Sequence, residues 1–216
     1  ELVRVWEETI NPAWHTFSFW WFNQLDGRGP LDLRSSLEEH FLALDLVARS
    51  GRPFEANVAH HFSFRGGDDL TAVLAAYLAA KAARSRGIRT FVLQIMLNTP
   101  RHLDGMKDLA KARAMLRLIR GLEGPDFKVL LQPRGGLDYF SPDEERAREQ
   151  LAAVTMLMDD IEPGRDDSPD MIHVVSYSEG QRLASPDIIN ESIRIVRMAL
   201  TEYRNAKARG DMGGPP

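Results

Sequence analysis

The chain has 216 residues, of which 44% are hydrophobic and 27% are charged, a composition that favours a globular protein with one substantial core over a disordered or membrane protein. The formal net charge of −4, with Lys and Arg scattered among Asp and Glu, offers no basic face for a nucleic-acid backbone. The absence of cysteine excludes disulfides and thiolate metal sites.

No run approaches the roughly 20 apolar residues that a membrane-spanning helix needs, and no signal-peptide pattern opens the chain. We therefore expect a cytoplasmic protein with no membrane partner. The first residue is Glu1 rather than Met, and it stands close to the first expected strand, so we expect a fragment of a longer chain.

Short apolar runs alternate with segments whose apolar residues recur at helical spacing. The expected strands are 17–22, 54–58, 90–97, 127–131 and 172–175. The expected helices are 34–49, 69–86, 104–122, 142–160 and 186–208. This alternation predicts five βα units over 1–209, followed by a disordered tail at 210–216.

Residues at the helix ends support these boundaries. Ser141 and Ser185 are expected N-caps, because each precedes a proline at the first helical position. Gly51, Gly87 and Gly124 follow helical stretches, where a left-handed residue ends a helix.

The strands are nearly continuous apolar runs, as in a parallel sheet that is covered on both faces. Such a sheet is either open and doubly wound or part of a (β/α) barrel, which normally needs about 250 residues. We expect a TIM-barrel-like α/β fold in which the chain supplies the last five parallel βα units, in sequence order.

Polar residues gather after the expected strands, and in both architectures ligands bind at the carboxyl ends of the strands. The candidates are His60, His61 and Arg65 after the second strand, Asn98 after the third, Arg134, Gly135, Gly136 and Tyr139 after the fourth, and Tyr177 and Glu179 after the fifth. An Arg-Gly-Gly turn occurs twice, at 65–67 and 134–136. Arginine suits a carboxylate or phosphate, and glycine permits close backbone approach. Alternatively, the glycines only make turns and the arginines pair with nearby aspartates.

His60 and His61 are adjacent, so in a strand their side chains would point to opposite faces and would not share a metal. We therefore expect no metal site. The aromatic stretch at 14–22 is expected in the core or at a subunit interface, and we expect an oligomer.

The segments “DFKVLLQPRGGLDYFSPDE” and “MIHVVSYSEGQRLASPDIINESIRIVRMAL” resemble the second half of the catalytic barrel subunit of adenosylcobalamin-dependent glutamate mutase (methylaspartate mutase) and related cobalamin-dependent mutases. The resemblance covers about 17–200. It implies an isomerase that rearranges a small carboxylic or amino acid by a radical mechanism. Because the DxHxxG cobalamin motif is absent, it also implies that adenosylcobalamin is carried mainly by a separate B12-binding domain or subunit.

The resemblance further implies roles for the polar residues. Glu179 stands where the family has a glutamate near the adenosyl ribose, which makes it the catalytic candidate, and the expected cofactor contacts are Glu179, Tyr177, Gly135 and Gly136. The expected substrate contacts are Arg65, Arg134, His60, His61, Asn98 and Tyr139. Val175 replaces a family lysine, so glutamate itself is not the expected substrate.

Two other functions stay open. The first is a phosphate-binding barrel lyase or aldolase that uses the Arg-Gly-Gly turns to hold phosphate. The second is a non-catalytic binding domain that retains the barrel architecture.

Overall fold

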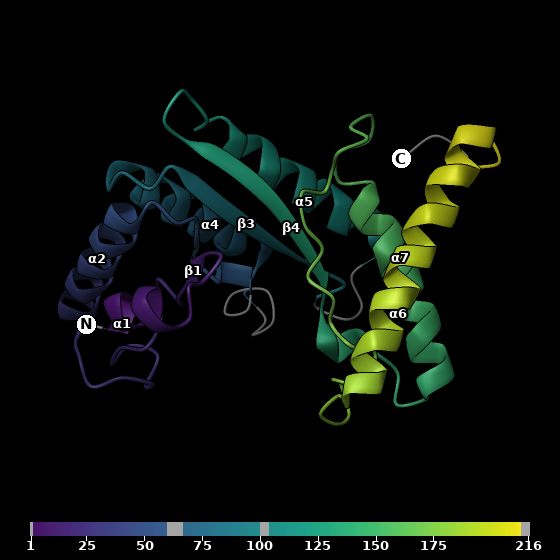
Figure 1. The fold of residues 1–216 in the computed structure, drawn as a ribbon, viewed down its shortest axis with the longest axis horizontal. Coiled ribbons are helices and arrows are strands. Elements are labelled where there is room, and N and C mark those ends of the chain that lie inside the picture. Colours follow the sequence, from purple (N-terminus) through teal and green to yellow (C-terminus); the bar gives the residue numbers. More distant parts are fainter. Residues whose placement is uncertain (1, 60–66, 100–103, 213–216) are drawn as a thin grey trace. The chain divides into compact units, whose positions relative to one another are not determined.

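The structure is a computed structural model that describes residues 2–59, 67–99 and 104–212. Its centre is a four-stranded parallel sheet in the order β1-β2-β3-β4 (Figure 1). The strands are β1 (His15–Thr16), β2 (Phe54–Glu55), β3 (Thr90–Leu97) and β4 (Lys128–Gly135). The helices are α1 (Leu2–Thr9), α2 (Leu33–Ser50), α4 (Asp69–Ser85), α5 (Gly105–Arg120), α6 (Glu144–Asp159) and α7 (Pro186–Arg209), with a 3-10 turn at Leu137–Tyr139.

The sheet confirms the α/β class and the sequence-adjacent parallel order of these strands. Phe54 of β2 pairs with His15 of β1 on one side and with Phe91 of β3 on the other. Closure of the strands into a (β/α) barrel stays a prediction.

The first expected strand, at 17–22, is wrong. The strand is two residues long and lies at His15–Thr16. The N–H groups of Phe17 and Phe19 still donate to the carbonyls of Glu55 and Ala56 (both 3.3 Å), but the chain forms turns from Phe19 onward. The cause is Asp26, whose carboxylate accepts the backbone N–H groups of Phe22 (2.9 Å) and Asn23 (3.1 Å). These two donors are therefore not available to a sheet, and Phe22 adopts a positive φ of 71°. Helix α1 was not expected either.

The fifth expected strand, at 172–175, is not a regular strand in the structure. The chain there still runs beside β4, because the N–H groups of Met171 and His173 donate to the carbonyls of Leu131 (3.2 Å) and Pro133 (3.1 Å). Two donors of β4 on this edge are not available for regular pairing. Pro133 has no N–H, and the N–H of Leu131 donates to the carboxylate of Asp170 (2.8 Å).

Two compact units make up the chain, and each is described by itself. The first consists of 1–94 and 114–130. Its core contains an aromatic cluster in which the rings of Phe17 and Phe54 lie 4.7 Å apart and Phe19 is fully buried. The expected core role of the 14–22 stretch is therefore confirmed for Phe19, whereas Phe22 is 47% exposed.

The second unit consists of 95–113 and 131–216, and it is held together by α6 packing on α7. At the end of α6, Asp159 pairs with Arg204 (2.6 Å) and Lys207 (2.5 Å) of α7. The carboxylate of Asp160 accepts the hydroxyl of Tyr203 (2.5 Å), which is also on α7. The acidic end of one helix thus binds the basic end of the next.

Several expected helix ends are confirmed and two are wrong. Gly51 and Gly87 have positive φ values of 73° and 83°, and the Ser185 hydroxyl accepts the Ile188 N–H as an N-cap. Helix α6 is capped by Asp143 instead of Ser141, because the Ser141 hydroxyl accepts the N–H of Asp143 and delays the helix start. Gly124 pairs with Phe127 in an isolated bridge after α5 has ended. Of the expected tail, 213–216 lies outside the described residues.

In the described parts of the chain, no helix combines the length and the apolar character needed to cross a bilayer.

Candidate functional site

The turn after β3 is tied to helix α5 by buried charges. Asn98 has a positive φ of 58°, and its N–H donates to the carboxylate of Asp108, which is fully buried. The Nζ of Lys111 lies 3.2 Å from the other oxygen of Asp108 and 3.3 Å from the carbonyl oxygen of Thr99. Because a buried ion pair tolerates the loss of neither partner, this arrangement fixes the backbone of the turn.

The end of β4 approaches that turn closely. The N–H of Gly136 donates to the carbonyl of Leu97 (2.8 Å), which extends the pairing beyond β4. A methyl group on Gly136 would lie 1.8 Å from the Thr99 hydroxyl oxygen and 3.2 Å from Oδ1 of Asp138. Only glycine fits here. Gly135 is also crowded, since a methyl group there would meet Val154 at 3.3 Å.

Arg134 lies at the carboxyl end of β4, where the sequence placed it, but it is only 3% exposed. Its Nε donates to the carbonyl of Gly135 at 3.4 Å. Gln132, two residues earlier, projects to the same face of the strand and is also buried. A buried guanidinium needs several acceptors, so the surroundings of Arg134 must be polar.

Two polar atoms beside Gly136 have no hydrogen-bond partner among the residues that the structure describes. They are the hydroxyl oxygen of Thr99, a residue that is 1% exposed, and Oδ1 of Asp138. An unpaired buried polar atom is costly, and in native proteins it often has a function. Sequence reasoning missed Thr99, Asp108, Lys111 and Asp138. Thr99 and Asp138 could have been found from their place just after strands β3 and β4, whereas Asp108 and Lys111 lie within α5 and carry no such signal.

The turn at 177–180 lies against the 3-10 turn, because a methyl group on Gly180 would be 2.7 Å from the carbonyl oxygen of Leu137. Tyr139, at the end of the 3-10 turn, is half-buried and its carbonyl accepts from Gln150 (3.2 Å). The structure therefore brings together the regions of four predicted site residues, namely Asn98, Gly136, Tyr139 and Glu179. The predicted contacts His60, His61 and Arg65 lie outside the described residues.

Glu179 is exposed on this turn, and its Oε1 accepts the N–H of Ser176 at 3.1 Å. Arg182, three residues further on, pairs with Glu144 of α6. Glu179 therefore holds its own turn and keeps its side chain at the surface.

Tyr177 has a structural role in the second unit. It is 1% exposed, its hydroxyl donates to Glu191 of α7 (2.6 Å), and Arg148 of α6 donates to the same hydroxyl (2.8 Å). The Arg148 guanidinium also lies over the ring, 4.3 Å from its centroid. Burial, followed by the hydrogen bond to Glu191, raises the pKa of Tyr177, and the hydrogen bond from Arg148 lowers the pKa of Glu191.

Three of the expected cofactor contacts already touch other residues of the chain. The space next to Gly136 is taken by Thr99, the space next to Gly135 by Val154, and the Tyr177 hydroxyl by Glu191 and Arg148. Glu179 is the one expected cofactor contact whose side chain is exposed.

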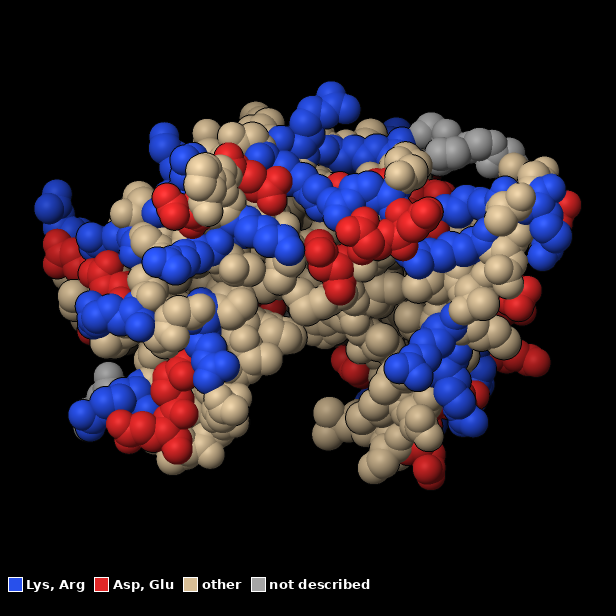
Figure 2. All heavy atoms as spheres, turned by 45° about the horizontal axis from the view of Figure 1, so that its top comes forward, with Lys and Arg blue, Asp and Glu red and all other residues tan. Residues whose placement is uncertain are grey.

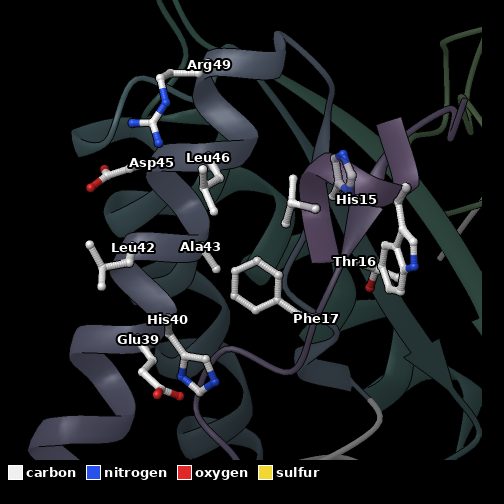
Figure 3. Close-up of a pocket in the computed structure, with 12 residues that line it drawn as sticks. His15, Thr16, Phe17, Glu39, His40, Leu42, Ala43, Asp45, Leu46 and Arg49 are labelled. Carbon is white, nitrogen blue, oxygen red and sulfur yellow. The ribbon is translucent and has the colours of Figure 1, made fainter. Parts of the chain in front are cut away.

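A separate hollow of about 740 Å³ lies in the first unit, between α1, β1 and α2. Figure 3 shows Ala43 and Leu46 of α2 on one side of it and His15 and Phe17 on the other. His15 is buried, and its Nε2 lies 2.5 Å from a carboxylate oxygen of Glu7. This nitrogen therefore already has a hydrogen-bond partner within the chain. The hollow is mainly apolar. Sequence reasoning missed it because α1 was not expected.

No group of three or more His, Asp or Glu side chains within the described ranges could hold a metal ion. In comparisons with known proteins, no family model and no curated protein matches the chain. The resemblance to cobalamin-dependent mutases stays a prediction.

We predict that Gly136→Ala destabilises the protein by about 1–3 kcal/mol, because the new methyl group would overlap the Thr99 hydroxyl. Gly124→Ala is the matched control, since a methyl group there has no neighbour closer than 3.8 Å. Urea denaturation of both variants measures the difference. Equal midpoints for the two variants would mean that the close approach at Gly136 carries no constraint.

A second prediction concerns pH. The pKa of Glu191 is lower in the folded state than its ordinary value of 4.5. The ion pair of Glu191 with Arg148 therefore contributes its full stability when the pH is above that ordinary pKa, and the contribution is lost as the pH falls through the lowered folded-state pKa. Glu191→Gln should therefore be less stable than the parent protein at neutral pH, and the difference should shrink in acid. Glu202→Gln, at an exposed position of the same helix, should show no such trend. Thermal unfolding between neutral and acidic pH distinguishes these outcomes.

Proposed function

We propose that the carboxyl edge of β3 and β4 binds the carboxylate of a small organic acid, and that the chain is the corresponding part of a (β/α)-barrel isomerase. The observation that supports this most is the gathering of two buried cations, Lys111 and Arg134, around a contact where Thr99 and Asp138 keep unpaired polar atoms. Lys111 contacts the Thr99 carbonyl, and Arg134 contacts Gly135, next to Gly136.

In this proposal Arg134 binds the carboxylate of the ligand. Lys111 lies 3.2 Å from Asp108, and Arg134 is the second buried cation of this edge. A charge-assisted hydrogen bond in such a buried place contributes about 1.5–3 kcal/mol. The Thr99 hydroxyl and Asp138 would then orient the rest of the ligand, with Asn98 and Tyr139 on the neighbouring turns.

The finer part of the proposal rests on the resemblance alone. It is a mutase-type rearrangement of a small carboxylic or amino acid, with adenosylcobalamin supplying radical chemistry from a separate B12-binding domain or subunit. Glu179 is the surface residue of the edge that would face such a partner.

Nucleic acid remains a poor candidate ligand. Figure 2 shows Asp and Glu among the Lys and Arg side chains of the visible face, and the net charge is −4.

We predict that Arg134→Gln weakens the binding of succinate or propionate by about 2–5 kcal/mol, because it removes the charged partner of a desolvated carboxylate. Titration calorimetry measures the effect, and circular dichroism checks that the variant is folded. Arg165→Gln is the control, since Arg165 is paired with Asp167 at the surface of the same unit.

Because Arg134 is buried, Thr99→Val provides a second variant of nearly equal volume. Weakened binding in both variants supports the proposal. Binding that neither variant changes, or no binding of any tested acid, would contradict it. Inorganic phosphate that competes with succinate and binds more tightly would favour the phosphate-binding lyase or aldolase.

A further inference from the structure

Helix α4 is apolar on both of its faces. The face that packs into the first unit consists of small residues, and it contains Ala72, Ala75, Ala76, Ala79, Ala80 and Ala83. The opposite face carries Leu70, Leu74 and Leu78, which are 76%, 51% and 41% exposed. A helix that is apolar all round is normally buried on all sides, so the leucine face is expected to have a cover.

The three leucines form one row, because residues four apart lie on the same side of a helix. We call Leu70, Leu74 and Leu78 the leucine ridge. The other large apolar residues exposed on the described helices of the first unit are less regular; Leu118 of α5, for example, is 48% exposed but has Ala114 four residues before it.

The leucine ridge is complementary to itself. If two copies of α4 pack antiparallel about Leu74, Leu70 of one copy faces Leu78 of the other, and Leu74 faces its own symmetry mate. The same register brings Lys81 of one copy to within one residue of Asp68 on the other, and both residues are exposed.

The charges along α4 favour the antiparallel orientation. The acidic residues Asp68 and Asp69 stand at its N-terminal end, and the basic residues Lys81, Arg84 and Arg86 at or just beyond its C-terminal end. Antiparallel packing sets unlike charges and unlike ends of the helix dipoles side by side, whereas parallel packing would set like charges together.

We propose that the leucine ridge of α4 is an interface between two copies of this chain, packed antiparallel about a two-fold axis at Leu74. Such an interface is isologous, because the same patch serves both copies. The interface is independent of the proposed carboxylate site.

The chain has no cysteine, so single cysteines report this interface without background. Facing Cα atoms of two packed helices come within the roughly 4.4–6.8 Å that a disulfide spans. Under mild oxidation, Leu74→Cys should form a covalent dimer, and Leu118→Cys, with almost the same exposure, should not. A mixture of Leu70→Cys and Leu78→Cys should cross-link to each other, while each variant alone should cross-link weakly.

Sedimentation equilibrium gives the non-covalent test. Leu74→Glu should weaken the dimer at least about tenfold, since it places a charge at the centre of an apolar contact, and Leu118→Glu should leave it unchanged. A parent protein that stays monomeric, a dimer that Leu74→Glu does not weaken, or cross-linking of Leu70→Cys alone as strong as that of its mixture with Leu78→Cys would each overturn the proposal.

Discussion

The arrangement of the carboxyl edge depends on the buried ion pair between Asp108 and Lys111. Both side chains are at most 5% exposed, and their charged atoms lie 3.2 Å apart. Asp108 holds the N–H of Asn98, and Lys111 holds the carbonyl of Thr99. If either partner were lost, the other charge would stay buried and uncompensated, at a cost of about 3–5 kcal/mol. The pair is therefore a poor source of stability but a strict determinant of how the chain turns after β3.

The fixed turn after β3 also determines the position of the residues at the carboxyl end of β4. Thr99 is held against Gly136, and the N–H of Gly136 donates to the carbonyl of Leu97. The pairing of β4 with β3 therefore continues past Arg134. On the other edge of β4, Pro133 has no N–H and the N–H of Leu131 donates to Asp170, so two donors that a fifth regular strand would use are not available. Arg134 thus lies on a strand that is rigid on one side and irregular on the other, which suits a binding edge.

Local signals predicted much of the fold but little of the site. Helix α4 and strand β3 follow directly from periodicity, and Ser185 and Gly51 cap their helices as expected because capping is a local interaction. Strand β1 was misplaced because the hydrogen bonds of Asp26 compete with the sheet, and sequence patterns do not rank such competitors. Asp108 and Lys111 look like the solvated charges of any surface helix, so their burial became evident only in three dimensions, as did the use of the Tyr177 hydroxyl by α6 and α7.

The most direct test of this account is amide hydrogen exchange in an Asp108→Asn variant. Losing the carboxylate should release the turn after β3, so the protection of the Asn98 and Gly136 amides should fall by about a hundredfold or more, the change expected for about 3 kcal/mol. The amide of Val196, in the middle of α7, should keep most of its protection, which separates a local release from global unfolding. Unchanged protection at Asn98 and Gly136 would contradict the claim that the buried ion pair fixes the carboxyl edge.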